Sequence, residues 1–222
     1  GEGAVPRRFS LAAAGDALIH KKVYTAARKK DGSYDFRPML RLVKSRISAH
    51  DLAFYNQETL LGGKELGLST YPRFNSPREV GDAFLDAGFN LVSLANNHTL
   101  DRGEKGVLRS LEYWKGKNQA FSSGSFATGK EAEELRTVKV NGITCAFFAY
   151  TTATNGLRAP KGSGHYVSVY TPGRVEADIK RARGKADVVI VSMHWGSEYV
   201  FDPTPEQIQI AAHLASLGVN LV

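Results

Sequence analysis

The chain is organised around one stretch of its sequence, Ser93-Leu94-Ala95-Asn96-Asn97-His98-Thr99-Leu100-Asp101. This stretch overlaps the end of an apolar run, residues 89–94, which is typical of a buried strand. Two amides, an imidazole and a carboxylate therefore stand at the carboxyl end of that predicted strand. In an open α/β sheet, the carboxyl ends of parallel strands face the crevice in which ligands bind. The stretch predicts a binding site at this edge of the sheet.

Three other apolar runs end in polar groups of the same kind. Residues 9–14 end at Gly15-Asp16, residues 52–55 lead into Asn56-Gln57-Glu58, and residues 188–191 lead into Ser192-Met193-His194-Trp195-Gly196. Carboxylate and amide oxygens, together with imidazole nitrogens, suit divalent manganese, iron or zinc. No cysteine accompanies them, which argues against a structural zinc site. The four predicted strand ends indicate a metal-assisted hydrolase site, since four such endings are hard to explain as separate caps and turns.

The order of these motifs resembles the CapA/PgsA-like poly-γ-glutamate capsule-synthesis family, a branch of the calcineurin-like metallophosphoesterase superfamily. Two intervening stretches agree with that family: residues 71–77, Tyr-Pro-Arg-Phe-Asn-Ser-Pro, and the pair Glu198-Tyr199. The resemblance covers residues 9–222, which we expect to form one domain, with residues 1–8 as a linker or cloning remnant. It implies an α/β fold, a four-layer αββα sandwich of two mixed sheets flanked by helices.

The resemblance also implies roles for single residues. It implies metal ligands at Asp16, Glu58, Asn97 and His194, for one divalent ion or two. It implies that His98 lies near the leaving group, where an imidazole can protonate a departing oxygen or nitrogen. Asp101 then either orients His98 or caps the helix that follows.

One departure from the superfamily pattern concerns the first motif. The usual Asp-x-His would need a histidine at position 18, which is Leu18, and the nearby imidazole is His20. A long Gly-rich segment, residues 60–75, is expected to be a loop beside the site, because such loops are usually functional; a surface hairpin without ligand contact is the alternative. The remaining candidates are His20, Asn56 and Asn96 in the site, and Tyr71, Phe74, Asn75 and Glu198 on a substrate loop.

Apolar spacing predicts helices at 18–30, 38–47, 76–88, 105–117, 174–183 and 205–217. Ser76 is expected to cap the third of these with Glu79 as a capping box. The dipeptide Asn141-Gly142 predicts a hairpin between the apolar runs 135–140 and 143–150. The final apolar run, 218–222, indicates a strand that is cut at its last residue. Because the family continues there into a histidine-rich segment, we expect a truncated chain with an incomplete metal site.

Composition limits the partners. The 222 residues carry a formal net charge of +7, and 42% of them are hydrophobic. No apolar run approaches the roughly 20 residues that a membrane span needs. The positive charge can attract an anionic polymer such as poly-γ-glutamate, whereas the scattered Lys and Arg argue against nucleic acid. Cys145 lies in an apolar run and is expected to be a buried, inert residue.

Together these features indicate a metal-dependent hydrolase-like protein of the bacterial cell envelope that makes or processes a poly-γ-glutamate capsule. Two alternatives stay open: a non-catalytic module that holds the polymer, and a phosphodiesterase or phosphatase without a capsule role. We expect an extracytoplasmic location, a membrane or lipid anchor that this chain lacks, and membrane-associated capsule synthesis proteins as partners.

Overall fold

A computed structural model of the protein describes residues 3–222. Residues 1 and 2 of the predicted linker lie outside this described part. The first half of the chain forms a sheet of four parallel strands in the order β1-β2-β3-β4. Their bounds are β1 (Leu11–Asp16), β2 (Leu52–Asn56), β3 (Leu91–Ser93) and β4 (Phe121–Ser123). Parallel neighbours need crossover connections, and the predicted alternation of strands and helices supplies them.

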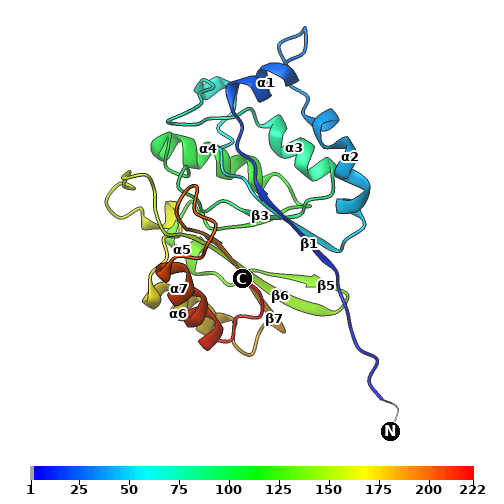
Figure 1. The fold of residues 1–222 in the computed structure, drawn as a ribbon, viewed down its shortest axis with the longest axis vertical. Coiled ribbons are helices and arrows are strands. Elements are labelled where there is room, and N and C mark those ends of the chain that lie inside the picture. The colour runs from blue at the N-terminus through cyan, green and yellow to red at the C-terminus, as the bar shows by residue number, and fades with distance from the viewer. Residues whose placement is uncertain (1–2) are drawn as a thin grey trace.

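Four helices make these crossovers and cover the outer face of the first sheet (Figure 1). They are α1 (Lys21–Ala27), α2 (Arg37–Ser48), α3 (Glu79–Asp86) and α4 (Gly103–Lys115). The predicted helix 18–30 is wrong at both ends. The Ile19 N–H donates to Thr59 Oγ1 instead of to a helical turn, and Arg28 pairs with Tyr34 in an isolated antiparallel bridge. Partners outside the helix, Thr59 at its start and Tyr34 at its end, thus limit α1.

The second half of the chain forms a mixed sheet in the order β5-β6-β7. Strands β5 (Thr137–Val140) and β6 (Ile143–Thr151) make the predicted antiparallel hairpin, whose turn residues Asn141 and Gly142 have φ angles of 50° and 77°. β7 (Val188–His194) runs parallel to β6. The chain's last strand-like residue, Leu221, pairs with Ile190 of β7 in a parallel bridge, as the terminal apolar run predicts.

The second sheet has its own helical cover, which Figure 1 shows below it. α6 (Pro172–Ala182) connects β6 to β7, and α7 (Pro205–Ser216) follows β7. Thr204 caps α7 with Gln207 as a capping box, and Thr171 caps α6. The short helix α5 (Gly129–Glu133) and two 3₁₀ turns, η1 (Lys64–Leu66) and η2 (Gly164–Tyr166), lie in the connecting loops.

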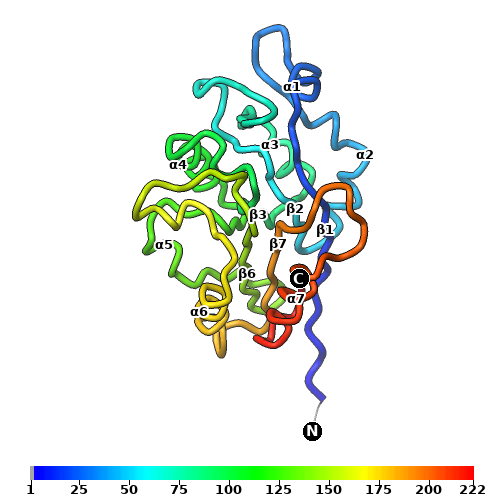
Figure 2. The backbone as a smooth tube through the Cα atoms, turned by 60° about the vertical axis from the view of Figure 1, so that its left-hand side comes forward, coloured from blue at the N-terminus to red at the C-terminus, as the bar shows by residue number. Residues whose placement is uncertain are grey.

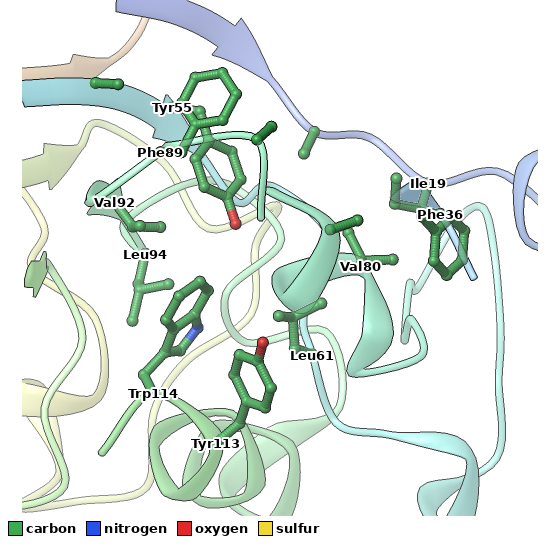
Figure 3. Packing of buried hydrophobic residues seen from close by; sticks show 14 of the residues in the cluster. Ile19, Phe36, Tyr55, Leu61, Val80, Phe89, Val92, Leu94, Tyr113 and Trp114 are labelled. Atoms are coloured by element: carbon green, nitrogen blue, oxygen red, sulfur yellow. The ribbon is translucent and has the colours of Figure 1, made fainter. Parts of the chain in front are cut away.

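The two sheets pack face to face, so the layers are helices, sheet, sheet, helices, as predicted. The prediction of two mixed sheets is wrong for the first sheet, whose strands are all parallel because each pair is joined by a helical crossover. Between the sheets, Phe54 of β2 meets Phe147 of β6 edge-on, with 6.0 Å between ring centroids. Cys145 is fully buried in this interface and is not part of any disulfide. A second cluster, with Tyr55 and Trp114, fills the space between the first sheet and its helices (Figure 3). Trp114 is therefore a packing residue.

The predicted capping box at Ser76 is wrong. α3 begins at Glu79, and Ser76 is fully buried, with its hydroxyl donating to Thr59 Oγ1 at 2.8 Å. The hydroxyl is used to hold the 60–75 loop against the core, so it is not available to the helix.

In both ribbon and tube views the segment before β1 leads away from the body of the domain (Figure 2). Within residues 3–222, no helix has the length and apolar character needed to cross a membrane.

Candidate functional site

The site lies at the carboxyl ends of strands from both sheets. Asp16 ends β1, Asn56 ends β2 and His194 ends β7, while Glu58 and the 93–101 stretch follow β2 and β3 directly. Asp16 is in register with Asn56, and Asn56 with Ser93. Because β1, β2 and β3 are parallel, their polar ends share one edge of the sheet. β7 delivers His194 to the same place from the second sheet.

His194 is the centre of the cluster. Its Nε2 lies 2.9 Å from Asn97 Oδ1 and 3.7 Å from Glu58 Oε1. On the other side of the ring, Nδ1 lies 3.9 Å from Asp16 Oδ1. The structure thus brings all four predicted metal ligands together around one imidazole. Burial lowers the pKa of His194, which favours the neutral ring that metals bind.

Glu58 and Asp16 place two negative charges close together. Glu58 is only 8% exposed, and burial, followed by the charge of Asp16, raises the pKa of Glu58 to about 7. Two carboxylates that repel each other in a partly desolvated site are stabilised by a cation. This electrostatic imbalance, together with the oxygen and imidazole donors, fits a divalent metal ion.

The donors are arranged in pairs and do not form a closed cage. Among residues 3–222, no group of three or more His, Cys, Asp and Glu side chains is arranged to hold one ion. The reason is the orientation of His194, whose two nitrogens face different carboxylates. Asn97, an oxygen donor, completes the set on the Nε2 side. The donor atoms are therefore of the kinds that bind a metal. They lie on two sides of the His194 ring, with Asp16 near Nδ1 and with Glu58 and Asn97 near Nε2.

His98 and Asp101 form a buried pair beside these donors. His98 Nδ1 lies 2.7 Å from Asp101 Oδ2, and the two residues are 8% and 3% exposed. Burial lowers the pKa of His98, but the hydrogen bond and charge of Asp101, with the charge of Glu58, outweigh it, so the pKa is raised. Asp101 orients His98. The alternative that Asp101 caps the next helix is wrong, because the N-cap of α4 is Arg102.

Asn56 and Asn96 support the cluster from behind. Asn56 Nδ2 donates to Asp16 Oδ1 at 2.8 Å. Asn96 Nδ2 donates to Asn56 Oδ1 at 3.2 Å and to the Gln57 carbonyl at 3.0 Å, and its Oδ1 accepts the His98 N–H at 2.9 Å. Both amides are buried. They link the ends of β1, β2 and β3 into one network and fix the directions of Asp16 and His98.

His20 is linked to the site through Phe74. The rings of His20 and His98 each meet Phe74 edge-on, at centroid distances of 5.2 and 4.8 Å. Phe74 is 1% exposed, and its N–H donates to Asp101 Oδ2 at 2.8 Å. The 60–75 loop is therefore anchored beside the site, where the sequence predicted it. His20 packs on the loop instead of taking the missing Asp-x-His position.

The three other residues of the predicted substrate loop differ in their placement. Asn75 is fully buried; its Oδ1 accepts the Gly62 N–H, and its Nδ2 donates to the carbonyls of Gly63 and Gly67. Because every polar atom of this side chain is used, Asn75 shapes the loop and the predicted substrate contact there is wrong. Tyr71 is 78% exposed on the same loop. Glu198 is exposed after β7, and its charge helps to raise the pKa of Glu58 and of His98.

Sequence reasoning missed Asn155. Its Oδ1 accepts a hydrogen bond from Asn97 Nδ2 at 3.2 Å, so it orients the amide that faces His194. Asn155 has a φ angle of 53° and precedes Gly156. Asn-Gly is a turn signal, and the Asn155-Gly156 pair was the one clue to this residue.

The profile of the bacterial capsule synthesis protein PGA_cap family matches residues 10–222. The chain belongs to this family. Two relatives agree: the PGA biosynthesis protein CapA of Bacillus subtilis (strain 168) is 29% identical over 144 residues, which are 62% of this chain and 36% of the relative. The capsule biosynthesis protein CapA of Bacillus anthracis is 25% identical over 226 aligned positions, which cover 97% of this chain and 53% of the relative. The chain thus spans about half the length of these relatives, or less.

Solved structures share the fold at low sequence identity. A protein of Staphylococcus aureus, described as a putative 5′-nucleotidase in complex with α-ketoglutarate, has a TM-score of 0.50 and 10% identity, over 93% of this chain and 42% of that one. The 5′-nucleotidase precursor of Thermus thermophilus has a TM-score of 0.50 and 13% identity, over 85% of this chain and 37% of that one. The predicted metallophosphoesterase-like fold is confirmed.

Proposed function

We propose that this domain is a metal-dependent hydrolase-like domain of the bacterial cell envelope that acts on an anionic capsule polymer, poly-γ-glutamate. The single observation that supports it best is the cluster around His194, in which two mutually repelling carboxylates, an amide oxygen and an imidazole meet at strand ends beside a protonatable His98. The names of the relatives favour a capsule polymer, and through it an association with the envelope.

The chemistry follows from the residues. Asp16, Glu58, Asn97 and His194 would hold the metal, which supplies an activated water and stabilises developing negative charge. The hydrogen bond and charge of Asp101 raise the pKa of His98, which favours the imidazolium form of this proton donor. Its Nδ1 is committed to Asp101, so Nε2 is the atom that protonates a leaving oxygen or nitrogen. Asn96 keeps the His98 backbone in place during this transfer.

The test measures metal and turnover separately. Elemental analysis of the purified domain gives its content of manganese, iron and zinc, and titration calorimetry gives its affinity for manganese. Turnover is then followed on bis-p-nitrophenyl phosphate and on γ-glutamyl peptides. His194→Ala should lose both metal and turnover, and His50→Ala, at an exposed histidine after α2, should keep both.

A non-catalytic polymer-binding module is the second candidate, and two observations favour it. Leu18 stands where the superfamily pattern has a histidine, and the ligands of residues 3–222 are paired instead of closing a three-residue cage. Stoichiometric metal with cleavage of γ-glutamyl bonds supports the hydrolase and contradicts the module. Binding of polymer without metal or turnover supports the module. Cleavage of the phosphodiester alone contradicts the capsule substrate.

A further inference from the structure

Two adjoining hollows open beside the His98–Asp101 pair. The first has a volume of about 610 Å³, and its walls include Asp101, Arg73 and Arg102. The second, of about 510 Å³, continues to Arg174. They share Leu100, Leu157 and Arg158 in their walls. We name the combined depression the arginine groove, after Arg73, Arg102, Arg158 and Arg174.

The positive charge of this groove is not neutralised by the protein. Within the described residues, 3–222, none of the four arginines forms a salt bridge. Arg102 is held rigidly, but by neutral acceptors: the carbonyls of Leu66 and Gly67 and the hydroxyl of Ser69, at 2.8 to 3.0 Å. The one acidic side chain in the walls, Asp101, is engaged by His98. The groove therefore presents guanidinium groups to an outside anion, and guanidinium binds carboxylates in a two-pronged geometry.

Asp101, which lines the first hollow, has a buried acceptor without a partner among the residues described. Both donors that reach Asp101, the His98 ring and the Phe74 N–H, use Oδ2. Oδ1 is buried and accepts no hydrogen bond from the residues described. An unmet buried acceptor costs about 1–3 kcal/mol, so a ligand that offers a donor at this place is stabilised. An oxyanion has no hydrogen to offer, whereas an amide N–H does.

An apolar cluster forms part of the remaining walls. Leu100, Val167, Leu157, Ala159 and Val169 belong to one hydrophobic cluster that underlies the two hollows. Such a surface suits the methylene groups of a ligand. The lining of both hollows contains no aromatic side chain on which a nucleic-acid base could stack. Carboxylates, amide N–H groups and methylenes are thus the three chemistries that the groove can receive.

We propose that the arginine groove binds an amide-linked chain that carries carboxylates, such as a γ-linked glutamate polymer, and leads it to His98. The four arginines take carboxylates, Asp101 Oδ1 accepts an amide N–H, and Leu100 and Leu157 contact the methylenes. This rests on the proposed function, because it names the residues that hold the substrate of the same site. It goes beyond that function because it assigns a polymer-binding surface that is separate from the proposed metal ligands.

The test is a binding assay on the whole domain without added metal. The probe is a fluorescein-labelled γ-linked glutamate oligomer, followed by fluorescence anisotropy at low and at physiological salt. Arg158→Glu is the informative variant, because Arg158 lines both hollows and its side chain makes no hydrogen bond or ion pair within residues 3–222. We expect it to weaken binding about tenfold or more, since one charge-assisted contact is lost and a repulsion is added.

Two comparisons make the assay specific. Arg41→Glu makes the same charge change at an exposed position of α2, and it should change the affinity by less than about twofold, as expected for a distant screened charge. Arg158→Lys should retain part of the affinity. Inorganic polyphosphate of similar total charge, which has no N–H donor, should bind more weakly than the glutamate oligomer.

Three results would overturn the groove: equal losses in Arg158→Glu and Arg41→Glu, tighter binding of polyphosphate than of the oligomer, or no binding of the oligomer at low salt. These outcomes are independent of the hydrolase proposal. If the domain binds metal and cleaves bis-p-nitrophenyl phosphate but does not bind the oligomer, the groove proposal alone is refuted. If it binds the oligomer in an Arg158-dependent way but takes up no metal, the proposal of a metal-dependent hydrolase alone is refuted.

Discussion

Asp101 Oδ2 lies 2.7 Å from His98 Nδ1 and also accepts the Phe74 N–H at 2.8 Å. One carboxylate oxygen therefore orients the candidate proton donor and anchors the 60–75 loop. The two events are coupled, because a loop that moved away would leave this buried oxygen with one donor fewer. The His98 ring and the 60–75 loop thus share one anchor, Asp101 Oδ2.

The first prediction concerns this pair. Asp101→Asn removes the charge that raises the pKa of His98, whereas the burial that lowers it stays. The pKa of His98 should fall, and NMR titration of the imidazole ring protons measures it. Asn can still accept the Phe74 N–H, so the fold should persist. An unchanged His98 titration would mean that Asp101 does not control this proton.

The second prediction concerns the loop. Phe74 is 1% exposed and packs against two imidazole rings, so Phe74→Ala should lower the free energy of unfolding by about 3–5 kcal/mol. Tyr71→Ala, on the same loop but at a residue that is 78% exposed, should change it by less than about 0.5 kcal/mol. Urea denaturation followed by circular dichroism compares them. Equal effects would mean that the loop is not packed on the site.

The third prediction concerns the pH dependence of stability. The pKa of Glu58 is raised from 4.5 to about 7 in the folded state, so the native protein binds a proton more tightly than the unfolded chain between these values. Stability should therefore fall as the pH rises from about 4.5 to about 7. Glu58→Gln removes this loss and should stabilise the metal-free protein by about 1–2 kcal/mol at pH 8, after allowance for solvent screening.

At pH 4.5 the same substitution should have little effect on stability, because Glu58 is protonated in the folded protein. Urea denaturation in the presence of EDTA measures both conditions. With added manganese at pH 8, the wild-type protein should instead be more stable than Glu58→Gln, because the carboxylate of Glu58 binds the cation and the amide of glutamine does not. A Glu58→Gln protein that is equally stabilised at both pH values would show that its effect is not electrostatic.

The fourth prediction concerns Asn75. Asn75→Ala leaves the Gly62 N–H and the carbonyls of Gly63 and Gly67 without their partner. The unfolding free energy should fall by about 2–4 kcal/mol, as several buried polar groups become unsatisfied. Asn118→Ala, at an exposed asparagine after α4, is the matched control. Limited proteolysis should cut the 60–75 loop of the Asn75 variant first; protection equal to wild type would contradict the role of Asn75 as a loop anchor.

The local sequence determined the order of the elements and the polar ends of the strands. Hydrophobic periodicity and turn chemistry act over a few residues, so the β5–β6 hairpin at Asn141-Gly142 and the helices α4 and α7 could all be predicted. Asp16, Asn56 and the 93–101 stretch could also be placed at one edge, because the carboxyl ends of parallel strands face the same edge of a sheet. The resemblance of these motifs to a family supplied the second sheet and the roles of single residues.

Only the tertiary structure decided how side chains from distant segments pair. It brought His194 of the second sheet to 2.9 Å from Asn97 of the first, and it turned the two nitrogens of that ring towards different carboxylates. It used Ser76 and Asn75 inside the loop, where the local pattern predicted a cap and a substrate contact. It also gathered Arg73, Arg102, Arg158 and Arg174 along one groove. A side chain satisfies its hydrogen bonds and charge with whatever the packed chain brings near it, and no local pattern contains that information.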